Sequence, residues 1–379
     1  MRYPISVYYV VSTLRRCGPV RQLYYLIKFL DRTKFKPHII TLSDEPENSL
    51  KEYFLEMVEQ ITTLELTKSQ VISPWNNKFS DLIAKLAPDL IHSQGIRADI
   101  LVARLPDMFC RVCTQRNNPF EDYLMQYGRI AGIGLAYLHR WALKKIPNSV
   151  ACSHTIAKRN VQLGVESHVI LNGTDIPSFN SIKSDEEKQV ARKSLGLPTN
   201  GPLFLFAGPL ITRKSVDVLI RAFLSCPVST PNRTLCILGD GPMMSELVRL
   251  ADNNVQIIFA GDVGNTSQYY SVADVLVSAS LSEGLPNSVL EGLAWGLPVL
   301  LSDIPSHRAI LEHNKLIGSL FPPNDFLKLA ESICEMQVSK CLKEAARSLA
   351  IENFSAELMS NKYQQLYELS LKPLDYNRK

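Results

Sequence analysis

The chain has 379 residues, of which 46% are hydrophobic and 21% are charged, and its formal net charge at pH 7 is +4. This length suits two domains, and the composition is that of a soluble globular protein. So small a net charge excludes a strongly basic nucleic-acid-binding protein, and we expect no nucleic-acid partner. No apolar run reaches the roughly 18 to 20 residues of a membrane-spanning helix.

The first 42 residues predict a strand, a helix and a second strand. The apolar segment 5–11 is too short for a signal peptide and predicts the first strand, so we expect the protein to stay in the cytoplasm. A loop with Gly18 leads to a helix over about 20–30, and 37–42 is the next strand. This unit lacks the full Gly-x-Gly-x-x-Gly pattern, so it does not predict a dinucleotide site.

Eight cysteines are scattered along the chain, which indicates reduced thiols in a cytosolic protein. Cys110 and Cys113 form a single Cys-x-x-Cys inside a strand-like run. Without a second pair nearby, buried strand thiols are a better interpretation than a zinc site. We therefore expect no metal centre.

Polar residues in the N-terminal half follow two predicted strands. The strand 89–93 holds His92 near its end, and the strand ending at 114 leads into a polar loop with Arg116, Glu121 and Asp122. Open α/β sheets bind ligands beyond the carboxyl ends of their strands. For His92, an equally weighted alternative is a structural histidine bonded to the backbone.

The segment 137–145 predicts a basic, partly amphipathic helix. Such a face is usually only solvated. The alternative is that it docks on an anionic membrane surface.

In the C-terminal half, two cations lie between a strand and a helix. The strand 203–207 is followed by Gly208, then by Arg213 and Lys214, and a helix begins near 216. Lysine offers a compact charge and arginine a bidentate fork, both suited to a diphosphate. The alternative is a pair of solvated loop cations.

The most informative stretch is 274–303, which predicts a strand, a loop, a short helix and another strand. Glu283 lies in the loop and Glu291 in the helix. A helix that begins at the carboxyl end of a parallel strand offers free N–H groups to an anion. The alternative for Glu291 is a capping box with Ser288, which needs no function.

One string resembles the donor-site signature of retaining family 4 glycosyltransferases. It begins with Glu283-Gly-Leu-Pro, has seven residues between Glu283 and Glu291, and continues with Gly296-Leu-Pro-Val299. The resemblance implies the GT-B fold, an α/β architecture of two Rossmann-like domains that face each other across a cleft. It implies an acceptor-side domain over 1–175, a linker over 176–200, a nucleotide-sugar domain over 201–353, and a helix over 354–379 that returns to the first domain.

The resemblance also implies roles for individual residues. Glu291 would bind the ribose hydroxyls and Glu283 a hydroxyl of the donor sugar, while Lys214 and Arg213 would bind the diphosphate. The predicted catalytic set is Glu283, Lys214 and Arg213. Further donor-binding residues would be Gly284, Leu285, Pro286, Asn287, Gly208 and Gly18. The predicted acceptor-side residues are Arg116, Glu121, Asp122 and His92. The sequence departs from the family where Arg116 replaces a frequent histidine and Pro209 a usual arginine.

The function implied by the resemblance is transfer of a sugar, with retention, from a nucleotide-sugar donor to a hydroxyl of a glycan or lipid-linked acceptor. The expected setting is bacterial surface polysaccharide synthesis (capsule, O-antigen or lipopolysaccharide), in the cytoplasm or peripherally on the inner face of the membrane. No Asp-x-Asp occurs, so neither a metal nor another cofactor is expected. The alternatives are a sugar-nucleotide epimerase of the same fold, a non-catalytic nucleotide-sugar-binding protein and, less favoured, an NAD-dependent oxidoreductase.

Overall fold

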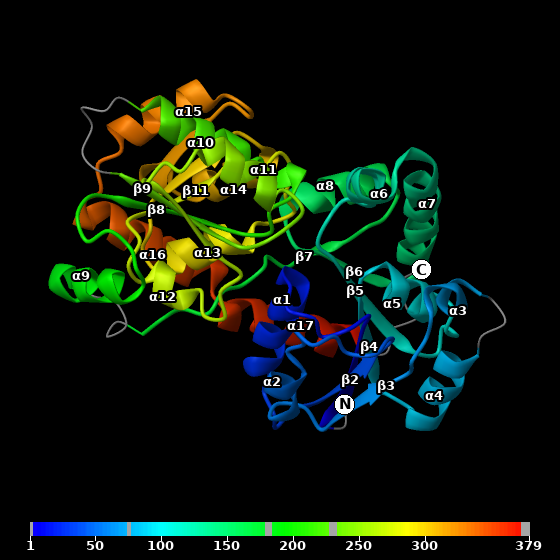
Figure 1. The fold of residues 1–379 in the computed structure, drawn as a ribbon. Coiled ribbons are helices and arrows are strands. Elements are labelled where there is room, and N and C mark those ends of the chain that lie inside the picture. The colour runs from blue at the N-terminus through cyan, green and yellow to red at the C-terminus, as the bar shows by residue number, and fades with distance from the viewer. Residues whose placement is uncertain (1–2, 74–76, 179–183, 227–232, 373–379) are drawn as a thin grey trace. The chain divides into compact units, whose positions relative to one another are not determined.

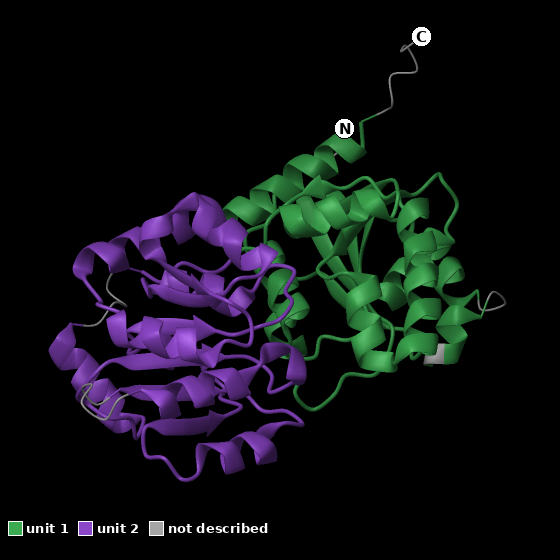
Figure 2. Cartoon of the chain, turned by 90° about the horizontal axis from the view of Figure 1, so that it is seen from above, with its two compact units in different colours: residues 1–173, 356–379 green, residues 174–355 purple. Residues whose placement is uncertain are grey.

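A computed structural model describes residues 3–73, 77–178, 184–226 and 233–372 (Figure 1). The chain divides into two compact units. Unit 1 comprises Met1–Gly173 together with Ala356–Lys379, and unit 2 comprises Thr174–Ser355 (Figure 2). Each unit is built around one parallel sheet, which confirms the predicted α/β class.

The sheet of unit 1 has seven strands in the order β3-β2-β1-β4-β5-β6-β7. All pairs are parallel, and the register places Ile5 opposite Phe35 and Val7 opposite Leu90. The strand order reverses between β1 and β4, which makes their carboxyl ends the switch point of this sheet. The strands are β1 (Ile5–Val11), β2 (Phe35–Thr41), β3 (Gln60–Thr63), β4 (Leu90–Gln94), β5 (Cys110–Gln115), β6 (Asn148–Ala151) and β7 (His168–Val169).

Helices cover both faces of this sheet, as the alternation along β1 requires. Val7 and Tyr9 lie in one hydrophobic core, and Tyr8 and Val10 lie in another. Successive strand residues point to opposite faces, so a strand with both sets buried must be covered twice. The helices are α1 (Gly18–Lys28), α2 (Lys51–Leu55), α3 (Lys68–Ile72), α4 (Lys78–Leu86), α5 (Ile96–Ala103), α6 (Pro119–Tyr127), α7 (Arg129–Lys145), α8 (His154–Gln162) and α17 (Ala356–Ser370).

The last helix, α17, belongs to unit 1 although the whole of unit 2, Thr174–Ser355, separates it in sequence from the rest of that unit. It packs on α1, and Tyr363 and Tyr367 lie fully in the same core as Val7 and Tyr9. Ser360 donates a hydrogen bond to the carbonyl of Leu26 at 2.8 Å. This helix is therefore part of the hydrophobic core of unit 1.

The sheet of unit 2 has six parallel strands in the order β10-β9-β8-β11-β12-β13. They are β8 (Leu203–Ala207), β9 (Thr234–Leu238), β10 (Ile257–Gly261), β11 (Val275–Ser278), β12 (Val299–Ser302) and β13 (Gly318–Phe321). The helices are α9 (Asp185–Ser194), η2 (Thr212–Lys214), α10 (Val216–Ser225), α11 (Met244–Ala251), α12 (Ser267–Tyr270), α13 (Asn287–Ala294), α14 (Pro305–His313), η3 (Lys315–Ile317), α15 (Phe326–Glu335) and α16 (Lys340–Phe354).

Two glycines allow the close approaches that position the loops of unit 2. Gly239 has φ +126°, and a Cβ there would lie 1.9 Å from the carbonyl oxygen of Gly208. A Cβ on Gly292 would lie 2.9 Å from Leu276 of β11. Glycine at these positions lets the loops after β8 and β9 touch and lets α13 lie directly on β11.

Within the part of the chain that the structure describes, no helix has the length and apolar character needed to cross a membrane.

Candidate active site

Three loops of unit 2 meet because the strands before them are neighbours. The sheet order places β8, β11 and β12 side by side, and the strand order reverses between β8 and β11. Their carboxyl ends lead into η2, into the loop 279–286 before α13, and into the start of α14. The switch point of a doubly wound sheet is where such proteins bind ligands.

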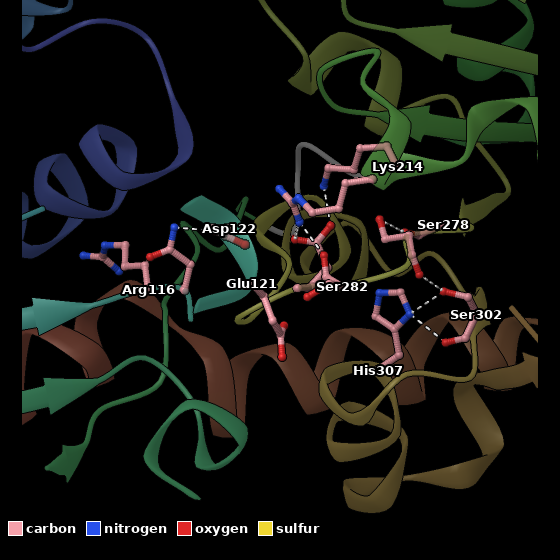
Figure 3. Close-up of polar contacts among 12 residues, drawn as sticks. Arg116, Glu121, Asp122, Lys214, Ser278, Ser282, Ser302 and His307 are labelled. Carbon is pink, nitrogen blue, oxygen red and sulfur yellow. Dashed lines mark hydrogen bonds and ion pairs between the residues drawn. The ribbon is translucent and has the colours of Figure 1, made fainter. Parts of the chain in front are cut away.

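The loops after β8 and β11 place two cations on one carboxylate (Figure 3). The Lys214 Nζ lies 2.5 Å from Glu283 Oε1, and an Arg213 guanidinium nitrogen lies 2.9 Å from Glu283 Oε2. Arg213 also donates to the carbonyl of Ser282. The side chains of Lys214 and Glu283 are 10% and 9% exposed, so this is a nearly buried charge cluster. The structure thus brings together the three residues predicted as the catalytic set.

Glu283 is ionised in this setting. Burial alone raises the pKa of Glu283, but the nearby charges of Lys214 and Arg213, with hydrogen bonds from Lys214 and Ser280, outweigh it and lower the pKa to about 2. The cluster therefore carries two positive charges and one negative charge at neutral pH. It retains one unit of positive charge for an anionic ligand.

The backbone turns sharply just after Lys214. Ser215 has φ 45° and ψ 48°, in the left-handed region, where η2 passes directly into α10. Non-glycine residues in this region cost energy and concentrate at functional sites. The turn keeps Lys214 beside Glu283 at the end of β8.

The predicted capping box of Ser288 and Glu291 is wrong. Helix α13 begins at Asn287, its N-cap is Pro286, and no side chain makes a cap hydrogen bond. Ser288 consequently lies inside the first turn, two residues after the N-cap position. Glu291 is half-buried on α13, while Leu285 and Pro286 are buried in the loop before it. The helix-capping explanation of Glu291 therefore no longer applies.

In unit 1, His92 lies in the core and not at a ligand-accessible strand end. Its exposure is 0%, and its ring nitrogens lie 2.7 Å from the Tyr367 hydroxyl and 2.8 Å from the Thr114 hydroxyl. Burial, together with the charge of Arg116, lowers the pKa of His92 to about 3. The predicted backbone bond is wrong, because both partners are side chains, and an acceptor would reach His92 only by breaking these bonds.

The other predicted acceptor-side residues lie on β5, α6 and the loop between them. Arg116 donates to the side chains of Asn172 and, at 3.3 Å, Gln94. Glu121 forms an ion pair with Arg159 at 2.8 Å, and Asp122 accepts a bond from Asn117. These contacts order the loop after β5.

A cavity of about 400 Å³ opens at the β1/β4 switch point of unit 1. It is lined by Val11, Ser12, Thr13, Arg15, Cys17, Pro19, Val20, Asp44, Pro46 and Gln94. Gly18 lies between two of these residues, at the start of α1. The sequence analysis missed Gln94 and Asp44, although both follow strands that it predicted.

Sequence reasoning also missed a serine and histidine network beside Glu283. Ser302 donates to the carbonyl of Ser280 at 2.5 Å, and Ser278 and Ser280 hydroxyls lie 3.3 Å apart. His307 Nδ1 lies 2.8 Å from the carbonyl oxygen of Ser302 (Figure 3). Small polar residues at the ends of two adjacent strands were the available signal.

The described residues were also compared with the side-chain groups that bind metal ions. Among residues 3–73, 77–178, 184–226 and 233–372, no group of three or more His, Cys, Asp or Glu side chains is arranged to hold a metal ion. Cys113 is buried and Cys110 partly buried, and neither forms a disulfide.

These features define an α/β protein with two parallel sheets and a cluster of two cations and one carboxylate at a switch point. Comparisons with known proteins identify the family. Models described as "Glycosyl transferases group 1" and "Glycosyltransferase Family 4" match residues 187–350 and 17–177. The chain therefore belongs to the group 1, family 4 glycosyltransferases, and it has the GT-B fold.

Three similar proteins illustrate this membership. The O-antigen biosynthesis glycosyltransferase WclY of Escherichia coli is 23% identical over 96% of this chain and 98% of its own length. An E. coli UDP-Gal:alpha-D-GlcNAc-diphosphoundecaprenol alpha-1,3-galactosyltransferase is 24% identical over 86% of each chain. The structure of Anabaena HepE with UDP and glucose superposes with a TM-score of 0.77 at 17% identity, covering 96% of this chain and 100% of that one.

Proposed function

We propose that this glycosyltransferase transfers a sugar from a nucleoside diphosphate sugar to a hydroxyl of a glycan or lipid-linked acceptor, with retention of configuration. The proposed setting is bacterial O-antigen or lipopolysaccharide-type synthesis, the process in the name of the E. coli relative WclY. The observation that carries the proposal is the cluster of Lys214, Arg213 and Glu283 at the switch point of unit 2.

In this proposal the two cations stabilise the leaving diphosphate. Cleavage of the donor's glycosidic bond leaves negative charge on the diphosphate, and positioned cations in a water-poor site lower that barrier. Lys214 is 8% exposed and Arg213 is adjacent to it. Gly208 and the turn at Gly284 and Asn287 would line the same donor site.

Each of the two glutamates binds one further part of the donor in this proposal. Glu283 is ionised and accepts hydrogen bonds from a hydroxyl of the donor sugar, while Glu291 accepts bonds from the ribose hydroxyls. Support for the second assignment is the position of Glu291, half-buried on the helix α13 that follows the carboxyl end of β11. We do not assign Glu283 as a covalent nucleophile.

The acceptor would occupy unit 1, at the cavity beyond β1 and β4. Asp44 and Gln94 offer hydrogen-bonding groups there, and Arg15 offers a charge. A diphosphate-linked lipid, as in the name of the second E. coli relative, is the acceptor class we favour. Arg116, Glu121 and Asp122 would shape the loop beside it.

A membrane surface on α7 would suit such an acceptor. Ile130, Ile133, Tyr137 and Trp141 recur at helical spacing, and their exposed fractions are 92%, 37%, 58% and 40%. Lys144 and Lys145 are exposed at the end of the same helix. Apolar and basic residues together on an exposed helix are typical of peripheral binding to anionic lipid, so we propose a peripheral location on the inner face of the membrane.

The test is a panel of UDP-glucose, UDP-galactose, UDP-N-acetylglucosamine and GDP-mannose, screened by thermal stabilisation and then for transfer. A ligand at 100 times its Kd should stabilise the protein by about 2.7 kcal/mol. The anomeric configuration of the product decides retention, and release of an epimerised nucleotide sugar would indicate an epimerase. If no nucleotide sugar or nucleoside diphosphate stabilises the protein, the proposal is wrong.

A further inference from the structure

His307 is a buried polar residue that the proposed reaction does not yet use. It lies in the first turn of α14, at the carboxyl end of β12, and its exposure is 0%. Its Nδ1 lies 2.8 Å from the carbonyl oxygen and 3.2 Å from the hydroxyl of Ser302. Among the residues that the structure describes, its Nε2 is buried and has no hydrogen-bond partner.

The chemical state of Nε2 follows from the bond on the other side of the ring. A carbonyl oxygen can only accept, so the Ser302 carbonyl fixes the proton on Nδ1. Burial lowers the pKa of His307 to about 4, which keeps the ring neutral at physiological pH. Nε2 is therefore a lone-pair acceptor, and a buried acceptor without a donor is unfavourable.

His307 belongs to the same site as Glu283. The charges of Glu283 and Lys214 both act on the ring, in opposite directions. Ser302, which holds Nδ1, also donates to the carbonyl of Ser280, whose side chain bonds Glu283. Figure 3 shows the second ring nitrogen on the side away from Ser302, toward Ser282.

We propose that His307 Nε2 accepts a hydrogen bond from a hydroxyl of the donor sugar, next to the hydroxyl assigned to Glu283. This inference rests on the proposed function. The Nε2 lone pair and the Glu283 carboxylate both accept hydrogen bonds, so a phosphate oxygen, which is also an acceptor, is disfavoured beside them. The ligand must instead donate, as a sugar hydroxyl does. His307 thereby becomes a residue that determines which donor sugar is held.

The proposed sugar contact also involves the ion pairs of Glu283. In the free protein Lys214 and Arg213 hold this carboxylate. A bound diphosphate competes for the same two cations, and the released Glu283 turns to the sugar.

Two substitutions separate the roles of the ring nitrogens. In His307→Asn the side-chain amide can replace Nδ1 as a donor to Ser302, and Nε2 is lost. In His307→Gln the longer amide can present an acceptor near Nε2, and the bond to Ser302 is lost. The probes are the panel sugar that binds the parent best and its free nucleoside diphosphate, measured by calorimetric titration.

We expect His307→Asn to bind the intact donor about three- to tenfold more weakly and the free diphosphate unchanged, as loss of one neutral hydrogen bond predicts. His307→Gln should melt at a lower temperature than His307→Asn but keep more donor affinity. Equal losses for donor and free diphosphate in His307→Asn, or no loss for either, would overturn the inference and leave the proposed function intact. Failure of the parent to bind any panel member would refute the proposed function, and this inference with it.

A measurement on the parent protein gives a check that needs no folded variant. The chain has seven histidines, so their ring nitrogens can be followed by ¹⁵N NMR. A donor that bonds Nε2 of His307 should move the resonance of an unprotonated nitrogen with no hydrogen-bond partner, and the free diphosphate should move it less. An unchanged resonance at saturating donor contradicts the proposal.

Discussion

Lys214 and Glu283 are 69 residues apart in the sequence, and their side chains meet at 2.5 Å with about nine-tenths of each buried. Breaking such a pair from one side leaves a buried charge without compensation, which typically costs about 3 to 5 kcal/mol. The same contact keeps the cations occupied until an anion arrives. In the proposed mechanism the pair therefore links stability of the free protein to binding of the donor.

Glu283→Gln should consequently destabilise the free protein and still bind the nucleoside diphosphate. We expect the free energy of unfolding to fall by about 3 kcal/mol, because two cations lose their anion. Binding of the free diphosphate should be at least as tight as in the parent, while transfer falls by about 100-fold or more. Urea denaturation, calorimetry and product formation measure the three effects.

The matched control is Glu331→Gln, which removes a carboxylate from an exposed pair with Lys328 in the same unit. That pair should contribute less than about 1 kcal/mol. Weaker diphosphate binding by Glu283→Gln would show that Glu283 contacts the nucleotide portion and not the sugar.

Glu291→Gln should weaken nucleoside diphosphate binding by about 1.5 to 3 kcal/mol, since a ribose hydroxyl loses a charged acceptor. The melting temperature of the free protein should change little. Ser288→Ala is the control, and it should leave melting unchanged because α13 has no side-chain cap. If Glu291→Gln binds the diphosphate as tightly as the parent, the ribose assignment is wrong.

Stability should fall between pH 7 and pH 5 because of two buried neutral histidines. The pKa is lowered from 6.5 to about 3 in His92 and to about 4 in His307 by burial. Below pH 6.5 the unfolded chain binds protons that the folded chain does not, so the stability is full above 6.5 and declines as pH falls toward 4. Each histidine should cost about 2 kcal/mol at pH 5.

Urea denaturation at the two pH values checks this expectation, and His307→Asn should show about half of the drop. The carboxylate of Glu283, with its pKa near 2, stays ionised over this range and does not contribute. A stability that is equal at pH 7 and pH 5 would contradict the assigned neutral states.

Donor cleavage should survive excess EDTA, because Lys214 and Arg213 take the place of a metal at the diphosphate. The measurement is release of the nucleoside diphosphate with and without chelator. Complete loss of activity that Mg²⁺ or Mn²⁺ restores would show that the cations alone do not suffice.

Binding to vesicles should depend on anionic lipid and weaken as salt rises, because exposed charges are screened. Trp141→Ala should reduce binding further by removing part of the exposed apolar surface of α7. Co-sedimentation with anionic and neutral vesicles measures both effects. Equal binding to the two vesicle types would argue against the electrostatic part of this surface.

The fold, and the meeting of Arg213, Lys214 and Glu283, could be predicted because the strands that position them are encoded locally. Each buried strand is a short apolar run, and Arg213, Lys214 and Glu283 lie in the loops that follow β8 and β11. The carboxyl ends of parallel strands lie on one edge, which brings these residues together whatever the intervening sequence.

The remaining features depend on contacts between distant parts of the sequence and on the start of a helix, which a local pattern does not determine. One of the two partners of His92 is Tyr367, 275 residues away, so the burial of His92 was not apparent from the strand that carries it. The predicted capping box was wrong because helix α13 begins two residues earlier than expected, which is within the usual uncertainty of a helix boundary. His307 follows β12 in a sequence that matches no recognisable motif. Only the structure shows that Nδ1 bonds Ser302 and that Nε2 is left without a partner among the described residues.

The place of α17 has a consequence for how the protein is made. Unit 2 is continuous in sequence, whereas the core of unit 1 is complete only after Tyr363 and Tyr367 have been added. During synthesis all residues of unit 2 are therefore present before those of unit 1 are complete. Until α17 has been added, the first 173 residues have an uncovered apolar face. A nascent chain that stops before residue 356 would present that face to chaperones and proteases, and the folding of the first half is governed by the last helix.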